Sequence, residues 1–329
     1  MCKKHLVCLL ISALLFTGSL VHPQQQPTKV PQIGYLTGVS LAAHSARIEA
    51  FRQGLRELGY VEGKNIVIDW RSAEEKLDRF PALAAELVRL KVDIIVTAGA
   101  AGTRAAKEVT TTIPIVMAQD PDPVGSGFVA SLARPGGNIT GLSALAPELN
   151  GKRLELLKEI VPKLSRVAVF GTSTQPGNAQ SLKEVELAAK AFGVKLQYLD
   201  VPDAKDIETA FRAATKGRAD AVLILLPARV ASSQRTQIAE LAVKSRLPAI
   251  YDRSEFVEHG GLMTYGVNFT DLDRRAATYV DKILKGRTPA ELPVEQPMKF
   301  EFIVNLNTAK QIGLTIPPNV LVRADKVIR

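Results

Sequence analysis

Short apolar runs alternate with helical stripes from about residue 30 onward. The apolar runs of the first half predict strands at 32–38, 65–70, 93–99 and 114–119. Between them, apolar side chains recur three or four positions apart, as they do over 80–88, and this spacing places them on one face of a helix. Strands that alternate with helices in this way predict parallel βαβ units, in which the helices cover the sheet.

The same alternation restarts after residue 143 and predicts a second lobe built like the first. A helical stripe spans 147–161, and later apolar runs predict strands at 166–171, 195–200, 221–226 and 247–252. We expect the connection between the two series near 141–146. The predicted fold class is therefore α/β, with two doubly wound, Rossmann-like lobes.

The C-terminal part departs from this order. It predicts a strand at 262–268, a helix at 270–285, an extended run at 298–307, a short helix around 308–313 and an extended piece near 320–323. A series this short cannot close a lobe of its own, so we expect it to cross back and complete both sheets. Several crossings between two lobes make a hinge. The expected N-terminal lobe is 30–142 plus 269–298, and the expected C-terminal lobe is 143–268 plus 299–329.

The first residues have the pattern of an export signal. A positive start at 3–5 precedes an apolar run of 11 residues at 6–16, and Pro23 follows soon after. A membrane-spanning helix needs about 20 apolar residues, so this run is too short to span. We therefore expect a signal peptide over 1–22 and a periplasmic protein.

Cysteine usage and charge narrow the class further. Cys2 and Cys8 both lie in this leader, so the mature chain has no disulfide and no cysteine ligand for a metal. Cys8 sits inside the apolar run instead of closing it, which argues against a lipid anchor. The net charge of +9 comes from mixed rather than blocked charges, and only 5% of residues are aromatic, which argues against nucleic-acid binding.

Catalytic and cofactor motifs are weak in this sequence. The mature chain holds two histidines, His44 and His259, with no H-E-x-x-H pattern, and we predict no metal site. Ser173 follows a predicted strand, but Gln175 stands where a nucleophile elbow requires glycine. The glycines over 97–103 do not fit the dinucleotide-binding spacing, and we predict no cofactor.

The segment 97–103 has another use, because it joins a strand end to a helix start. The first N–H groups of such a helix are free, and the helix dipole favours an anion such as a carboxylate. Thr97 and Thr103 would add hydroxyl donors beside Gly99. An equally good interpretation is that Thr103 only caps the helix and the glycines only make a tight turn.

Further candidates lie at other strand ends, where open α/β folds place their ligands. They are Thr37, Gln119, Asp120, Thr172, Pro227, Tyr251, Asp252, Tyr265 and Asn268. Asp120 fits equally well as a turn or cap residue. Tyr251 either stacks on a ligand or packs in the core.

Long phrases of the sequence resemble the substrate-binding proteins of ABC transporters, in the group that includes tryptophan- and tyrosine-type binding proteins. Among them are FRQGLRELGYVEGKNI (51–66), PIVMAQDPDPVGSGFVASLARPGGNITGLS (114–143) and GKRLELLKEIVPKLSRVAV (151–169). Together such phrases cover nearly the whole mature chain. The resemblance implies the type I periplasmic-binding-protein-like fold, with three crossings between lobes and a ligand at the hinge. It also implies a monomer that docks on a membrane permease driven by a separate ATPase.

For an amino-acid ligand, the resemblance also implies roles for individual residues. The carboxylate would meet Thr97, Gly99 and Thr103, and the ammonium group would meet Asp252, Glu255 or Asp120. Family members often have a Thr-Pro-Ala-Thr-like run before the third helix, where this chain has AAGT at 100–103. The resemblance favours an aromatic or aliphatic amino acid as the ligand, and that departure keeps a nucleoside, a purine-like molecule or another organic solute as alternatives.

Two other classes of function fit the same fold. One is a periplasmic module that presents its ligand to a membrane receptor and transports nothing. The other is an exported α/β enzyme, which the weak catalytic motifs do not favour. Fold alone does not separate these classes.

Overall fold

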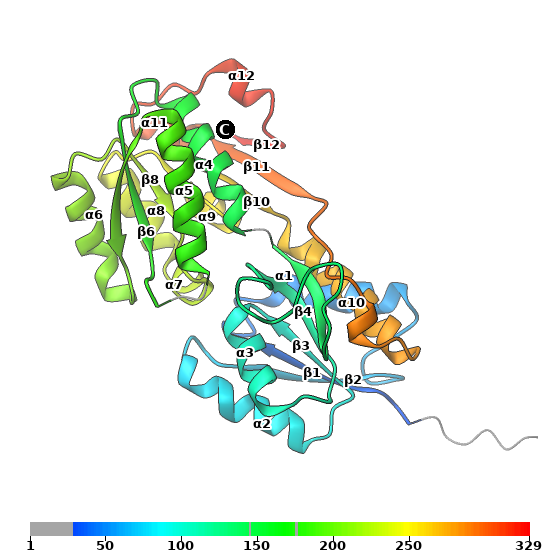
Figure 1. The fold of residues 1–329 in the computed structure, drawn as a ribbon. Helices are drawn as coiled ribbons and strands as arrows, with labels where there is room; N and C mark the ends of the chain where they lie inside the picture. Colours follow the sequence, from blue (N-terminus) through cyan, green and yellow to red (C-terminus); the bar gives the residue numbers. More distant parts are fainter. Residues whose placement is uncertain (1–28, 145, 175–176) are drawn as a thin grey trace, which may run out of the picture. The chain divides into compact units, whose positions relative to one another are not determined.

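The structure is a computed structural model that describes residues 29–144, 146–174 and 177–329 (Figure 1). The expected signal peptide at 1–22, with both cysteines, lies outside the described residues. Pro31–Arg329 forms one unit, which contains two α/β lobes. No helix in the described ranges is long and apolar enough to cross a membrane.

The N-terminal lobe is built on a five-stranded parallel sheet. The strand order is β2-β1-β3-β4-β5, with β1 (Gln32–Thr37), β2 (Val67–Ser72), β3 (Ile94–Ala98), β4 (Ile115–Asp120) and β5 (Ile139–Ser143). Between the strands run α1 (Ser45–Glu57), η1 (Leu77–Arg79), α2 (Phe80–Arg89) and α3 (Ala100–Val109). The pattern did not predict β5, because its run ITGLS carries a central glycine and follows Pro-Gly-Gly, both of which are turn signals.

The C-terminal lobe repeats this order and extends it. Its sheet runs β12-β11-β10-β9-β8-β6-β7. The strands are β6 (Arg166–Gly171), β7 (Lys195–Asp200), β8 (Ala221–Ile224), β9 (Ala249–Tyr251), β10 (Met263–Val267), β11 (Phe300–Asn305) and β12 (Lys326–Ile328). The five strands β6 to β10 follow the N-terminal order, and β11 is added antiparallel to β10. The chain therefore contains the same doubly wound unit twice.

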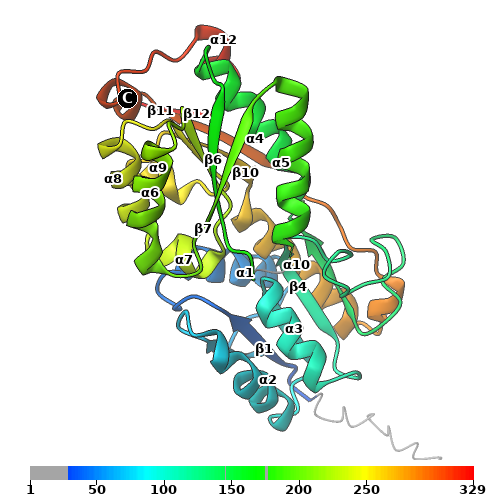
Figure 2. The ribbon, with the colours of Figure 1, turned by 60° about the vertical axis from the view of Figure 1, so that its left-hand side comes forward.

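Long helices and several shorter elements cover the second sheet, in keeping with the predicted alternation of strands and helices. The long helices are α4 (Ala146–Ile160), α5 (Asn178–Phe192), α6 (Ile207–Lys216) and α8 (Arg235–Lys244). The shorter elements are η2 (Ala204–Asp206), α7 (Ala228–Ser233), α9 (Glu255–Glu258), α11 (Leu306–Gln311) and α12 (Pro318–Leu321). Figure 2 shows α4 beside α5.

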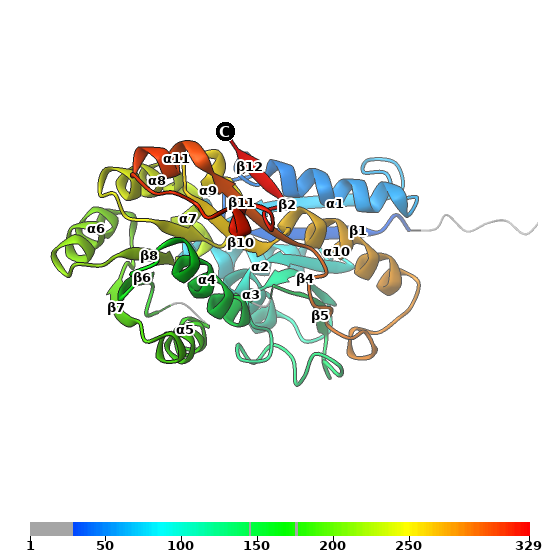
Figure 3. The same ribbon diagram turned by 90° about the horizontal axis from the view of Figure 1, so that it is seen from above.

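The described chain passes between the two lobes after β5, after β10 and before β11. Between the last two passages, α10 (Phe269–Leu284) packs along α1 in the N-terminal lobe, and η3 (Pro289–Glu291) follows it (Figure 3). The approach is close at Gly54, where a Cβ would lie 2.1 Å from the carbonyl oxygen of Arg274. Glycine is therefore needed where these helices meet.

Two expectations for the C-terminal part are wrong. The returning segment completes only the second sheet with strands, while the first sheet gains a helix and an isolated bridge between Leu142 and Glu295. The piece at 320–323 is not extended, because Pro318 opens the short helix α12 and the last strand comes later, at β12. Proline fits the first turn of a helix, since its missing N–H has no partner there.

Each sheet has an apolar cluster on both faces. In β8, Leu223 belongs to one cluster of the C-terminal lobe, whereas Val222 and Ile224 belong to the other. All three side chains are buried. Neighbouring strand residues point to opposite faces, so a strand that is apolar throughout must be covered on both sides. The middle of such a strand is closed to a ligand, so a site must use the strand ends, the loops that follow them or the neighbouring helix turns.

Candidate functional site

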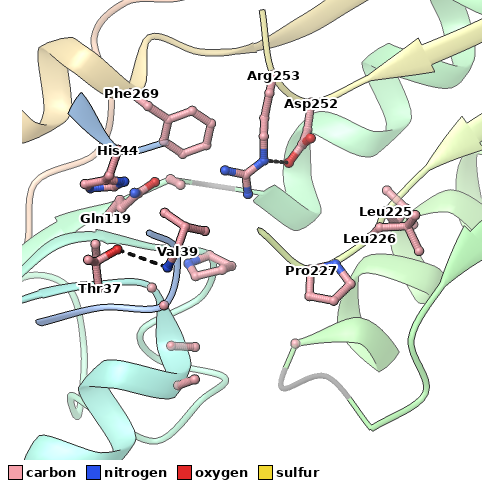
Figure 4. Close-up of a pocket in the computed structure, with 18 of the residues that line it drawn as sticks. Thr37, Val39, His44, Gln119, Leu225, Leu226, Pro227, Asp252, Arg253 and Phe269 are labelled. Carbon is pink, nitrogen blue, oxygen red and sulfur yellow. Dashed lines mark hydrogen bonds and ion pairs between the residues drawn. The ribbon is translucent and has the colours of Figure 1, made fainter. Parts of the chain in front are cut away.

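A cleft lies between the lobes, at the carboxyl ends of the parallel strands (Figure 4). The N-terminal lobe lines it with the ends of β1, β3 and β4 and the first turns of α1 and α3. The C-terminal lobe lines it with α4, the start of α5 and the loops after β8 and β9. Six of the residues predicted from the sequence line this cleft: Thr37, Gly99, Gln119, Pro227, Asp252 and Glu255.

Thr97 and Thr103 lie behind the wall of the cleft. Both are fully buried, their hydroxyl oxygens are 2.8 Å apart, and the Thr103 hydroxyl also donates to the carbonyl oxygen of Gly99. These hydroxyls hold the turn between β3 and α3, so in this structure they are not offered to a ligand. Gly99, Ala100 and Ala101 line the cleft at this turn, where φ at Gly99 is 99°. The first N–H groups of a helix have no partner within the helix.

Tyr251 and Thr172 are part of the C-terminal core and do not line the cleft. The ring of Tyr251 is fully buried and stacks on Phe256 with ring centroids 4.3 Å apart. Of the two interpretations that the sequence allowed for Tyr251, the structure therefore agrees with packing in the core. The Thr172 hydroxyl donates to the carbonyl oxygen of Val201 at 2.7 Å.

Tyr265, Asn268 and Asp120 lie next to the cleft. Asn268 caps α10, since its side-chain oxygen accepts from the backbone N–H of Asp271 at 2.7 Å. Tyr265 contributes its backbone carbonyl, which accepts a hydrogen bond from Arg153. Asp120 is fully buried, its Oδ2 has no partner in the described chain, and burial raises its pKa to about 7.

A buried hydrogen-bond chain supports the N-terminal wall. The Tyr35 hydroxyl donates to Asp273 Oδ1 at 2.6 Å and lies 3.1 Å from Nε2 of His44, which lines the cleft. Burial, with the nearby charge of Arg47, lowers the pKa of His44 to about 3, so the ring is neutral. Burial raises the pKa of Asp273 to about 6. The sequence analysis considered His44 only as a metal ligand and found that role unlikely. It did not predict the hydrogen bonds that link Tyr35, His44 and Asp273.

Contacts between the lobes gather around Phe269. The guanidinium groups of Arg47 and Arg253 lie 4.4 and 4.9 Å from its ring centre, and Figure 4 shows Arg253 beside the ring. Cations are attracted to aromatic faces at such distances. Arg47 also pairs with Glu255 at 3.0 Å, and Arg253 lies 3.4 Å from Asp252. Burial alone would raise the pKa of Glu255, but the two arginines outweigh it and hold that pKa below its ordinary value.

The first turns of α4 place two further polar side chains at the cleft. Arg153 is 3% exposed; its Nε donates to the carbonyl oxygen of Tyr265 at 2.7 Å, and its Nη1 donates to Asn150 Oδ1 at 2.5 Å. Asn150 is 1% exposed, and its Nδ2 has no partner among the described residues. Burial lowers the pKa of Arg153 to about 10, which leaves it a cation at neutral pH.

Sequence reasoning missed this pair on α4. A signal was present, because Asn150, Arg153, Leu154 and Leu157 follow the spacing of one helical face. Polar residues on the buried stripe of a helix need polar partners inside the protein. Such positions are therefore candidates for a site.

Apolar side chains complete the cleft. They come from both lobes: Val39, Leu77, Phe80, Leu225, Leu226, Pro227 and Phe269. In the ranges that the structure describes, no group of three or more His, Cys, Asp and Glu side chains is placed to hold a metal ion. The arrangement suits an organic solute that carries both charge and apolar surface.

Comparison with known proteins agrees with this geometry. Residues 32–328 match the family model described as ABC transporter substrate binding protein. The chain is 26% identical over 266 residues to the tyrosine-binding protein of Clostridioides difficile, a match that covers 81% of this chain and 76% of that protein.

Two solved structures are similar over 91% of this chain. One is a conserved domain protein from Vibrio cholerae, with 28% identity, all of that chain covered and a TM-score of 0.85. The other is an ABC domain from Streptococcus pneumoniae in complex with L-Trp, with 25% identity, 99% of that chain covered and a TM-score of 0.84. With its two-lobed fold and the cleft between the lobes, the chain belongs to the ABC transporter substrate-binding protein family, whose members are the solute-binding components of these transporters.

Proposed function

We propose that the cleft captures a free amino acid with a large apolar or aromatic side chain. The names of two relatives support this class of ligand, since one binds tyrosine and the other was solved with L-Trp. The observation that carries the proposal is the composition of the cleft wall. It combines the cation Arg153 and the carboxylates Asp252 and Glu255 with the rings of Phe80 and Phe269. A zwitterion with an apolar side chain needs both kinds of surface.

Capture would couple to closure of the two lobes. A ligand favours a closed arrangement only by the extra contacts that it makes there, so it must contact both lobes. The lobes 30–142 plus 269–298 and 143–268 plus 299–329 would move about the three connecting segments. The ion pair between Arg47 and Glu255 already joins them and would assist the closed state.

The rest of the proposal concerns the protein's surroundings. The chain would be exported by its leader, act as a monomer in the periplasm and pass its ligand to an ABC permease without chemical change. Its site would then contain ligand contacts and no catalytic residue. Among the predicted residues, Thr37, Gly99, Gln119, Pro227, Asp252 and Glu255 are the proposed contacts.

A thermal unfolding screen tests the class of ligand. The protein, purified after expression of the full-length chain and refolded to remove any bound solute, is heated with each of the common amino acids, nucleosides and small organic acids. A ligand at about 100 times its Kd adds about 2.7 kcal/mol of stability. We expect the largest shift with L-Trp, L-Tyr or L-Phe, followed by calorimetry for stoichiometry. A shift with nucleosides alone would contradict the proposal.

A further inference from the structure

Two side chains of α4 each keep a hydrogen-bond donor without an acceptor in the described chain, and one of these donor atoms, Asn150 Nδ2, is itself fully buried. Arg153 lines the cleft and uses Nε and Nη1 for the carbonyl of Tyr265 and for Asn150 Oδ1, which leaves Nη2 without a hydrogen-bond partner among the described residues. Asn150 uses its oxygen for Arg153 and leaves Nδ2 unpaired. The orientation of the Asn150 amide follows from this bond, because a guanidinium N–H requires an oxygen as its partner.

Both donors are side chains that folding has already placed and dehydrated. Arg153 is 3% exposed and Asn150 is 1% exposed, yet both line the cleft. A buried donor without an acceptor is unfavourable, and a buried charge even more so. Arg153 has no carboxylate within 4.0 Å among the described residues, whereas Arg47 and Arg253 each have one. What these donors lack is therefore an anionic acceptor with two oxygens.

A carboxylate that acts on Arg153 matches the ammonium half of a zwitterion. Asp252 is the carboxylate whose charge acts most strongly on Arg153, and it lines the same cleft. An α-amino acid carries its carboxylate and its ammonium group on one carbon atom. A donor pair with a carboxylate close by is thus the complement of such a ligand head.

We propose that Asn150 and Arg153 bind the carboxylate of the captured amino acid and that Asp252 accepts its ammonium group. This inference rests on the proposed function and adds its recognition site, which lies on the C-terminal lobe. It replaces the orientation expected from the sequence, in which the first turn of α3 receives the carboxylate. That turn offers only backbone N–H groups, because the hydroxyls of Thr97 and Thr103 bond to each other. Arg153 offers a full positive charge and its remaining donor Nη2, and Asn150 adds the donor Nδ2.

The test compares two ligands that differ only in the carboxylate. Binding of L-Trp and of tryptamine is measured by calorimetry for the wild type, Arg153→Met and Asn150→Leu. For Arg153→Met we expect about a thirtyfold loss of affinity for L-Trp, about 2 kcal/mol at 1.4 kcal/mol per tenfold, with tryptamine binding unchanged. Asn150→Leu removes one neutral donor and is expected to lose about tenfold for L-Trp alone.

Controls separate this inference from loss of the fold and from failure of the proposed function. Tryptamine reports an intact cleft in each variant, and Arg212→Gln, at an exposed ion pair of the C-terminal lobe, is the matched charge control. Equal losses for both ligands would make Arg153 a structural residue and overturn the inference alone. Unchanged L-Trp binding in Arg153→Met would do the same. A wild type that binds no amino acid would overturn the proposed function first, and the inference with it.

Discussion

The two walls of the cleft differ in how their buried polar groups are paired. On the N-terminal wall, Thr97 pairs with Thr103 and Tyr35 joins His44 to Asp273, and the buried atoms left unpaired among the described residues are acceptors, Oδ2 of Asp120 and of Asp273. On the C-terminal wall, which Asn150 and Arg153 line, the donors Asn150 Nδ2 and Arg153 Nη2 have no acceptor among the described residues. An unpaired buried donor costs about 1–3 kcal/mol, so it persists where a bound molecule supplies the partner. A ligand carboxylate needs donors, so the second wall is the surface that we propose for ligand recognition, and the first is the proposed scaffold.

Asp252→Asn gives the largest effect expected from this comparison. It removes the proposed acceptor for the ammonium group, and we expect about a hundredfold loss of affinity for L-Trp. Indole-3-propionate has no ammonium group and should lose little. Calorimetry with both ligands measures the ratio, and Glu208→Gln at an exposed pair is the control. An equal loss with both ligands would remove the special role of Asp252.

Asp120→Asn tests whether the N-terminal wall is only structural. The folded pKa of Asp120, about 7, lies above its ordinary value of 3.8. The protonated carboxyl therefore stabilises the fold below pH 3.8, and this stability is lost as the pH rises to 7. We expect the variant to gain about 2 kcal/mol over the wild type between pH 5 and pH 8, measured by chemical unfolding. Ligand affinity should not change, and a loss above tenfold would place Asp120 in the site.

Thr103→Val gives the smallest expected effect and sharpens the contrast. It breaks the Thr97–Thr103 hydrogen bond at nearly constant volume, and we expect unfolding to become easier by about 1 kcal/mol. Affinity for L-Trp should stay within twofold of the wild type, since neither hydroxyl faces the cleft. Thermal unfolding and calorimetry measure the two quantities. A large loss of affinity with unchanged stability would return Thr103 to the ligand.

The sequence predicted most of the fold because each element carries its own signal. Alternating runs marked β1 to β4 and β6 to β10, and the stripe of α4 was read to within a residue. The strand β5 was not predicted, because its central glycine and the turn residues before it are signals for a loop and outweigh the pattern of a short parallel strand. The helix α12 was not predicted, because a run of three or four apolar residues fits a strand as well as a helix.

The sequence also placed candidate residues at the carboxyl edge of the sheets, where the cleft lies. It did not distinguish residues that line the cleft from buried residues behind its wall. Tyr251 and Asp252 are neighbours in the chain, yet Tyr251 is buried against Phe256 and Asp252 lines the cleft. Strand alternation puts one in the core and leaves the next at the loop. Which of the two faces a ligand depends on where β9 ends.

By itself, the sequence determined the two doubly wound lobes, the return of the chain between them and the resemblance to a binding-protein family, because periodicity and local phrases are properties of neighbouring residues. Only the tertiary structure decided that α10 joins the first lobe, that Thr97 and Thr103 bond to each other and that Arg153 is buried with no ion pair to any described residue. Lys152, one position earlier, pairs with Glu155 where both are partly exposed. Adjacent cations on one helix thus have opposite surroundings, because burial depends on what packs against each face and not on residue type.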